Sequence, residues 1–246
     1  MSRPKAGHGE EGQVRAQRKE MTRLNLMNAA LSLVGQGNSF TALGIREITR
    51  EAGVVPTAFY RHFRNTDELG LALVETAGLT LRRMLREARQ SGLPTEDIIR
   101  LSISTYVSYL RQNQLVFRFI TTERSGGSRI LRLAIRNEIN HFVNELVMDI
   151  RSVAVYNNMS TQSLQMVGDL VVSTMMSAAS DILDILPGQP LVENEMIERL
   201  VSQLVVVFLG ASVWSERPDK GAKSGKSADA EGTESQIQND RQGDTA

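Results

Sequence analysis

Apolar residues recur at intervals of three and four residues along most of this 246-residue chain. In the first such segment, about residues 15–36, Leu26, Ala30 and Leu33 fall on one helical stripe. No run alternates between apolar and polar positions with hairpin turns at its ends, so we expect no β-sheet. The pattern predicts an all-α fold of about nine helices. The other helices are expected at about residues 44–50, 53–63, 66–90, 95–112, 115–123, 129–153, 161–185 and 192–214.

Composition divides the chain into four parts. Residues 1–14 are rich in glycine and polar residues, and residues 216–246 hold one large aliphatic residue, Ile237. Such segments bury too little apolar surface to offset the entropy of ordering them, so both are predicted to be disordered. Between them we expect a three-helix domain in residues 15–65 and a larger helical domain in residues 66–215.

A tight turn separates two short helices near the end of the first domain. Gly53 lies in this turn. Pro56 stands at the first position of the following helix, where its missing N–H and fixed φ are favourable. Thr57 and Ala58 come next, in the exposed first turn. Two short helices joined in this way form a helix-turn-helix, whose second helix can lie in the major groove. The sequence therefore predicts sequence-specific binding to double-stranded DNA.

Charge is distributed unevenly along the chain. Overall, 28 basic residues balance 28 acidic ones. Between Arg15 and Arg64, however, there are eight basic and three acidic residues, a net charge of +5, which leaves −5 for the remainder. A basic end on an acidic body suits a protein that presents one face to phosphates.

No segment indicates export or insertion into a membrane. The first ten residues contain no apolar run of the kind found in signal peptides. The longest apolar-rich stretch, Leu200–Trp214, is 15 residues long, whereas a membrane span needs roughly 20. The chain has no cysteine, which suits a reducing compartment. We therefore expect a soluble cytoplasmic protein with no membrane partner.

The helix-turn-helix region carries a specific sequence signature. It consists of Ala52-Gly53-Val54, Phe59-Tyr60-Arg61-His62-Phe63 and Asp67-Glu68-Leu69. In these residues and their spacing, the region resembles the DNA-binding domain of the TetR family of bacterial repressors. The resemblance implies a TetR-like fold, with an N-terminal DNA-binding domain and a C-terminal domain for ligand binding and dimerisation. Three positions depart from the common pattern: Val55 replaces a serine cap, Thr57 a glycine and Thr66 a lysine.

A longer set of residues narrows the resemblance. It comprises Pro56–Arg64 and Asp67–Leu71, and it extends to Val14–Glu20, Glu123–Gly126 and Arg136–Ile139. In these segments the chain is similar to the branch of the family that represses unsaturated fatty-acid synthesis and desaturation genes, the FabR and DesT repressors. This similarity implies that the regulated genes serve fatty-acid synthesis or desaturation. It also implies that the effector is a long-chain acyl-CoA or acyl-ACP.

The residues expected at the DNA fall into two groups, those that contact base edges and those that contact phosphates. Arg61 is the candidate for the most base-specific contact, because a guanidinium can donate two hydrogen bonds to guanine. The resemblance assigns phosphate contacts to Tyr60, His62 and Arg46, and such contacts position a protein without reading sequence. Phe59, in contrast, is expected in the core, as is Phe63.

A basic N-terminal arm completes the candidate surface. Arg15, Arg18 and Lys19 could follow the DNA backbone or enter the minor groove, and a solvated helix start is an equally good interpretation. The full set of candidate DNA-binding residues is Arg15, Arg18, Arg46, Val55, Pro56, Thr57, Ala58, Tyr60, Arg61, His62 and Thr66.

The second domain contains no constellation typical of catalysis or metal binding. The three histidines, His8, His62 and His141, form no pair at helical spacing, so we expect no enzyme, no metal and no cofactor. Apolar side chains there could line a tunnel for an acyl chain or simply form the core, and arginines after the sixth helix could hold coenzyme A phosphates or form a solvated surface. The candidate effector-binding residues are Tyr106, Leu110, Phe117, Phe119, Arg124, Arg129, Phe142 and Met175.

The last two helices are apolar on more than one face, which predicts contact with a second subunit. A homodimer would place two recognition helices on a palindromic operator. The candidate dimer residues are Leu170, Ala178, Leu204, Phe208 and Ala211.

Three functional hypotheses remain open from the sequence. The first is a repressor of fatty-acid genes that responds to long-chain acyl thioesters. The second is a TetR-type repressor of an efflux or catabolic gene, with an unrelated apolar small molecule as effector. The third is an all-helical enzyme or scaffold in which the helix-turn-helix is incidental.

Overall fold

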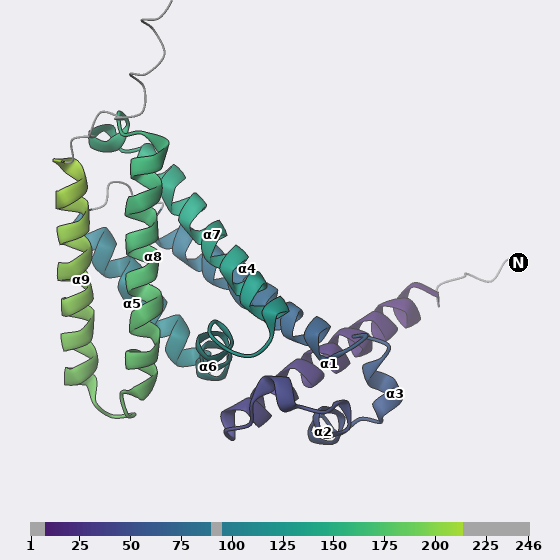
Figure 1. The fold of residues 1–246 in the computed structure, drawn as a ribbon. Coiled ribbons are helices and arrows are strands. Elements are labelled where there is room, and N and C mark those ends of the chain that lie inside the picture. Colours follow the sequence, from purple (N-terminus) through teal and green to yellow (C-terminus); the bar gives the residue numbers. More distant parts are fainter. Residues whose placement is uncertain (1–7, 90–94, 214–246) are drawn as a thin grey trace, which may run out of the picture. The chain divides into compact units, whose positions relative to one another are not determined.

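Nine α-helices and two 3-10 turns, without any strand, make up residues 8–89 and 95–213, which a computed structural model describes (Figure 1). The all-α prediction is confirmed. The elements are α1 (His8–Gly35), η1 (Phe40–Ala42), α2 (Ile45–Glu51), α3 (Pro56–Phe59), α4 (Thr66–Arg89), α5 (Glu96–Gln112), α6 (Gln114–Glu123), α7 (Arg129–Arg151), η2 (Ala154–Tyr156), α8 (Thr161–Asp184) and α9 (Pro190–Ser212).

Two helices differ most from the predicted bounds. Helix α1 begins at His8 rather than near residue 15, so residues 8–14, which were predicted to be disordered, are helical. The regular part of α3 ends at Phe59, and the following residues continue in helical turns. The disorder predicted for residues 216–246 falls outside the described residues, and the division into domains at residue 65 stays a prediction.

Side-chain caps fix the starts of several helices. The Thr95 hydroxyl accepts a hydrogen bond from the Ile98 amide, 3.4 Å away, as its position before α5 predicts. At the start of α4 the cap is Asn65, and Thr66 is the first helical residue. The Asn65 Oδ1 accepts from the Glu68 amide at 2.9 Å.

The first hydrophobic core joins the N-terminal helices to the rest of the chain. We call residues 8–63 the head and helices α5–α9 the body, with α4 running between them (Figure 1). Side chains from α4, α6 and α7 complete the core of the head, so its burial depends on the body. Its largest members include Leu26, Phe40, Ile48, Phe59, Phe63, Leu69, Phe119, Leu131 and Ile135.

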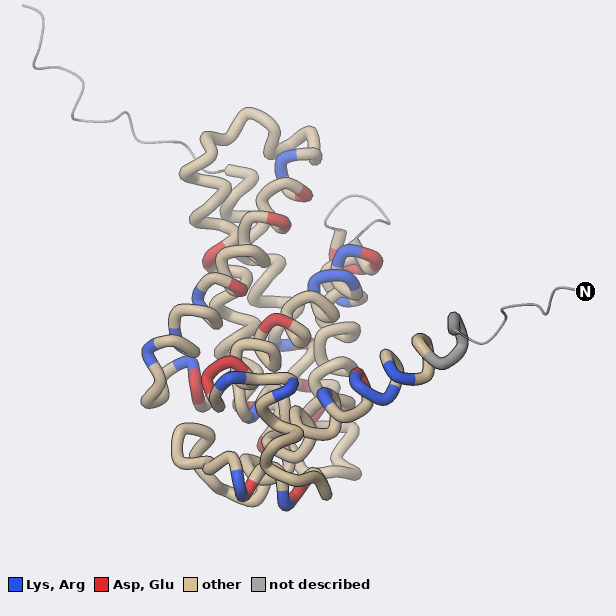
Figure 2. Tube along the Cα trace, turned by 90° about the vertical axis from the view of Figure 1, so that its right-hand side faces the viewer, with Lys and Arg blue, Asp and Glu red and all other residues tan. Residues whose placement is uncertain are grey.

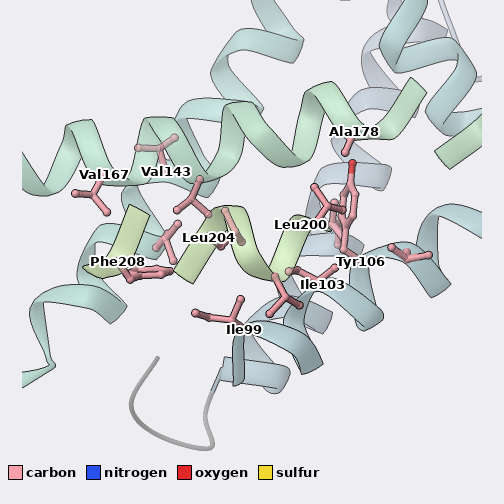
Figure 3. Packing of buried hydrophobic residues seen from close by; sticks show 14 of the residues in the cluster. Ile99, Ile103, Tyr106, Val143, Val167, Ala178, Leu200, Leu204 and Phe208 are labelled. Atoms are coloured by element: carbon pink, nitrogen blue, oxygen red, sulfur yellow. The ribbon is translucent and has the colours of Figure 1, made fainter. Parts of the chain in front are cut away.

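The second core lies among the helices of the body. Figure 3 shows Ile99, Ile103 and Tyr106 of α5 close to Leu204 and Phe208 of α9. The Tyr156 hydroxyl, in η2, donates a hydrogen bond to the Phe208 carbonyl at 3.1 Å. This hydrogen bond connects the C-terminal part of α9 to the segment between α7 and α8.

The second core corrects four of the five candidate dimer residues. Ala178, Leu204, Phe208 and Ala211 are between 3% and 8% exposed, because they pack inside their own subunit (Figure 3 labels the first three). A side chain buried in this way is not available to a partner. Leu170 is 50% exposed on the outside of α8 and stays a candidate.

Helix α8 is long and apolar enough to cross a membrane by length and composition, and no other helix in the described ranges meets that test. It packs against α7, α6 and α9, and it buries Leu164, Val167, Val171 and Ile182 in the second core. One side of α8 thus faces the second core, while Met166 and Leu170 remain exposed on the same helix.

Candidate DNA-binding surface and ligand cavity

The turn between α2 and α3 is held by backbone hydrogen bonds at a glycine. Gly53 has a φ of +67°, a left-handed conformation that favours glycine over residues with a Cβ. The Val54 amide donates to the Thr49 carbonyl at 2.9 Å, and the Gly53 amide donates to the Arg50 carbonyl at 3.2 Å. These two bonds satisfy the carbonyls at the end of α2 and fix the direction in which the chain enters α3.

Two buried aromatic rings hold α3 in the head. Pro56 occupies the first turn, as predicted, and Phe59 and Phe63 are 0% and 2% exposed. The rings of Phe59 and Phe63 lie 5.7 Å apart. With these rings inside, Tyr60 and Arg61 are exposed, Tyr60 to 62%, whereas His62 is half-buried. The expectation that Phe59 and Phe63 are core residues is confirmed.

Most of the candidate DNA-binding residues lie on the outside of this helix pair. Val55, Pro56, Thr57, Tyr60 and Arg61 are exposed, and Ala58 is half-buried beside them. Arg46 is exposed on α2, whereas Thr66 is half-buried at the start of α4. The structure thus brings the candidate reading residues together on one short helix, and their contacts with DNA stay a prediction.

His62 lies between α3 and the middle of α1. Its pKa is lowered, first by burial and then by the nearby charges of Lys19, Arg23 and Arg61, although Glu20 acts in the opposite direction. The imidazole is therefore neutral at pH 7, and its buried Nδ1 has no hydrogen-bond partner among the described residues. The Arg23 guanidinium lies 5.4 Å from the centre of the neighbouring Phe63 ring.

The basic arm is helical. Arg15 and Arg18 are exposed on α1, N-terminal to the part of the helix that is buried in the head. Figure 2 shows Lys and Arg recurring along this end of α1. A helix in this position carries its basic residues as a rigid extension of the head.

A cavity of about 140 Å³ lies in the body between α4, α5, α7, α8 and α9. Its wall is mostly apolar, and three of the eight candidate effector-binding residues belong to it: Tyr106, Phe142 and Met175. The Tyr106 hydroxyl donates to the Met175 carbonyl at 3.1 Å, and burial raises the pKa of this tyrosine, so the phenol stays neutral. The other polar side chains in the wall are Ser102 and Asp149.

The structure does not place the other five candidates in the cavity wall. Leu110 and Phe117 are buried in the second core, where the Phe117 ring packs edge-on against Tyr106 at 5.8 Å. Phe119 belongs to the core of the head instead. Arg124 and Arg129 are exposed at the two ends of the loop between α6 and α7 and do not line the cavity. The charge of Arg124 nevertheless acts on Tyr106, whose pKa it lowers against the larger effect of burial.

Several lining residues were missed, because helical spacing alone cannot tell a cavity wall from solid core. Asp149 and Ser102 are the residues from which the cavity could have been inferred in the sequence, since each is polar among apolar neighbours on its helix. The missed apolar lining residues include Leu81, Leu85, Leu146, Ile150 and Val172. Among the described residues, no group of three or more histidine, aspartate and glutamate side chains could hold a metal ion.

An exposed helix-turn-helix on a helical body with an apolar cavity is an arrangement suited to binding DNA at one end and a small molecule at the other. Residues 26–73 match the sequence model for "Bacterial regulatory proteins, tetR family". Residues 26–73 are thus similar to the N-terminal DNA-binding domain of the TetR family.

Solved structures with this fold cover most of the chain. A putative TetR-family transcriptional regulator from Syntrophomonas wolfei matches with a TM-score of 0.64 at 13% identity, over 77% of this chain and 96% of that one. The fatty acid degradation regulator FadR from Bacillus halodurans gives 0.58 at 13% identity, over 78% and 95%. FadR from Bacillus subtilis in complex with stearoyl-CoA gives 0.57 at 16% identity, over 78% and 99%.

Proposed function

We propose that this protein is a homodimeric cytoplasmic repressor of fatty-acid synthesis or desaturation genes, and that long-chain acyl-CoA or acyl-ACP controls its binding to a palindromic operator. The observation that carries the DNA-binding part is the exposed first turn of α3, where Val55 and Thr57 point away from the core. Phe59 and Phe63 fix this helix from below. A short helix that is rigidly held and exposed is suited to the major groove.

The proposed dimer rests on apolar side chains that remain exposed on the last two helices. Leu170 on α8 and Val206 and Leu209 on α9 are between 50% and 68% exposed. Exposed apolar residues gathered on neighbouring helices are typical of an interface between proteins. A second copy of the chain is the occupant that a two-fold operator requires.

The cavity is smaller than a long acyl chain, so an effector of this kind would have to enlarge it on binding. A cavity of about 150 Å³ holds a benzene-sized molecule, so the present 140 Å³ cannot contain a long acyl chain. Met175 and Met176 are flexible, half-buried side chains in its wall, and they can move to admit a longer ligand. A ligand that enlarges the cavity binds the expanded state more tightly, and this difference is what shifts a population.

The fatty-acid assignment draws on the resemblance to repressors of fatty-acid synthesis and on the shared fold of the FadR proteins. One of these was solved with stearoyl-CoA. In this chain the charged residue in the cavity wall is Asp149, an acid. An anionic coenzyme A head group would therefore remain outside the cavity, with only the acyl chain inside.

The test is a binding titration with promoter DNA from the chain's own genome. We expect tight binding to a palindrome upstream of a desaturase or fatty-acid synthesis gene, and loss of that binding when Tyr60 and His62 are both changed to alanine. Stearoyl-CoA and oleoyl-CoA should shift the operator affinity to different extents. Equal responses to both thioesters would remove the lipid-sensing part, and unchanged affinity of the double variant would remove the DNA-binding part.

The size and the apolar wall of the cavity also favour a second candidate effector, an unrelated small apolar compound that fits within about 140 Å³. Such a compound needs no enlargement of the cavity, whereas a long acyl chain does. The regulated gene would then encode an efflux or catabolic protein. Mass spectrometry of ligand that stays bound through purification distinguishes this compound from an acyl thioester.

A further inference from the structure

The N-terminal half of α7 presents apolar and basic side chains to solvent on one face. Arg129, Leu133 and Arg136 follow one another at intervals of four and three residues, so they share one stripe of the helix. Ile130 lies beside this stripe, three residues before Leu133. Ile130 is 49% and Leu133 43% exposed, and both arginines are exposed. We refer to Arg129, Ile130, Leu133 and Arg136 as the α7 basic face.

The two arginines of this face have no acidic partner. No ion pair or side-chain hydrogen bond joins Arg129 or Arg136 to any other residue that the structure describes. The acids of the same helix are directed to α4 instead, where Glu138 and Glu145 both pair with Arg82. A cation in the first turn of a helix also opposes the helix dipole, so Arg129 does not stabilise the start of α7. The local structure therefore leaves both positive charges available to a partner.

The apolar residues of the α7 basic face favour a protein partner over a nucleic acid. DNA phosphates are contacted by charged and polar groups, to which an exposed isoleucine and leucine add nothing. Protein interfaces, in contrast, combine arginine with an apolar centre. An amphipathic helix that carries carboxylates beside apolar residues would cover both kinds of side chain at once, with opposite charges facing each other. The face therefore fits an acidic helix of another protein.

The head group of free coenzyme A fits this face less well than a protein does. Arg129 and Arg136 are seven residues apart, which is about 10 Å along the helix axis. Leu133 lies between them and is exposed. A compact head group that pairs with one arginine leaves the other arginine and the apolar side chains in water. A protein helix, in contrast, is long enough to contact the whole face.

We propose that the α7 basic face docks an acidic helix of an acyl carrier protein, a contact that free acyl-CoA does not make. Phe142, which lines the cavity, follows Arg136 by six residues, about 9 Å along the axis of α7. A carrier protein on this face is therefore held near the site that receives its acyl chain. The identity of the partner rests on the proposed function, which includes acyl-ACP as an effector. The choice of an acidic protein rests on the face itself.

The experiment measures carrier binding without DNA. Fluorescently labelled stearoyl-ACP, made with the carrier protein of the same genome, is titrated with the full chain and followed by anisotropy. Calorimetry measures the binding of stearoyl-CoA to the same chains. The variants are Arg129→Glu, Arg136→Glu and Leu133→Asn. Arg83→Glu is the matched control, because Arg83 is an exposed arginine on α4.

We expect each charge reversal on the α7 basic face to weaken stearoyl-ACP binding by about tenfold, because it sets like charges against each other. Leu133→Asn should weaken it by about fivefold, because an apolar contact at the centre of an interface is lost. Arg83→Glu should bind stearoyl-ACP within about twofold of wild type, as is usual for a surface substitution. Stearoyl-CoA binding should be unchanged in all four variants, since none of these residues lines the cavity.

Circular dichroism identifies any variant that does not fold, and Arg136→Ala then replaces it. Unchanged stearoyl-ACP binding in both reversals would overturn the proposal. An equal loss of stearoyl-CoA binding would assign the arginines to the thioester, and a loss of operator affinity would assign them to DNA; either result also overturns it.

The docking and the proposed function can fail separately. A wild-type chain that binds the operator and stearoyl-CoA but no stearoyl-ACP would end the docking and leave the proposed function. A wild-type chain that binds no operator would end the proposed function, and the carrier titration would still decide whether the α7 basic face docks an acidic protein.

Discussion

The Phe40 ring lies edge-on against the Phe119 ring, with their centres 4.8 Å apart and their planes 61° apart. Phe40 belongs to η1 in the head and Phe119 to α6 in the body, and both are almost completely buried. An edge-to-face aromatic pair contributes about 0.5–1.5 kcal/mol beyond the area that it buries. The core of the head is therefore completed by a side chain from the body.

Phe119→Ala should weaken the whole fold. Loss of a fully buried phenylalanine typically lowers the free energy of unfolding by about 3–5 kcal/mol, and here the cavity would open where head and body meet. Urea denaturation followed by circular dichroism measures the change. Phe142→Ala is the comparison, because Phe142 is half-buried beside an existing cavity and should cost less. An equal or larger loss for Phe142→Ala would contradict this picture of the two cores.

The helical arm gives a prediction about salt dependence. If Arg15 and Arg18 follow the DNA backbone, replacing both with alanine should weaken binding to all sequences alike. For each phosphate that the variant no longer neutralises, the slope of log affinity against log salt should fall by about 0.9. Anisotropy titrations at several salt concentrations measure this slope, with Arg136→Ala on the exposed side of α7 as control. A slope that stays at the wild-type value would mean that the arm does not touch DNA.

The helix-turn-helix could be predicted because its determinants are local. Gly53 supplies the left-handed turn, Pro56 starts α3, and Phe59 and Phe63 recur at a spacing that buries both rings. Each effect acts over a few residues, so the sequence specifies it without knowledge of the rest of the fold. The bounds of α3 differ in detail, because its regular part covers Pro56–Phe59 within the predicted range of residues 53–63.

The cavity and the dimer surface could not be predicted in this way, because they depend on which helix faces pack together. Leu204 and Leu209 are both apolar residues of α9, yet the first is 5% and the second 61% exposed. Likewise Phe117 and Phe119 are two residues apart on α6 and enter different cores. Helical periodicity identifies an apolar face but does not name the neighbour against which that face packs.

Filling the cavity should separate effector response from DNA binding. Ser102 lies in the cavity wall on α5, and Ser102→Phe would place a ring in the space of about 140 Å³. We expect operator affinity within about twofold of wild type, because this site is remote from α3, and no response to stearoyl-CoA or oleoyl-CoA. Anisotropy titrations with each thioester measure both properties. A full response in the variant would place the effector elsewhere.

The two leucines of α9 distinguish the dimer surface from the core. Leu209→Arg places a charge on the exposed face, and we expect a folded monomer that binds the operator weakly. Leu204→Ala should instead lower the free energy of unfolding by about 2–5 kcal/mol. Sedimentation velocity and urea denaturation measure the two effects. If Leu209→Arg remains a dimer at micromolar concentration, the subunits associate through another face.

Glu123 at the end of α6 gives a prediction about pH. It is 2% exposed, and its Oε2 has no hydrogen-bond partner in the described part of the chain. Burial raises the pKa of this carboxyl, although a hydrogen bond from the Ser128 backbone and the charge of Arg132 act in the opposite direction. Because the pKa is higher in the folded state than in the unfolded state, the folded state binds the proton more tightly. This residue therefore favours folding below the ordinary glutamate pKa, and its contribution declines as pH rises through the raised value.

Glu123→Gln removes the buried charge and keeps the shape of the side chain. At pH 7–8 we expect the variant to be more stable than wild type, because a neutral amide in place of the buried carboxylate avoids the desolvation of a charge. The difference should shrink as pH falls toward 4, because the wild-type carboxyl is then protonated as well. Thermal unfolding at several pH values measures this trend, and Glu87→Gln, on the exposed side of α4, is the control. A stability difference that is the same at pH 4 and pH 8 would show that Glu123 is not held in the charge-disfavouring environment described here.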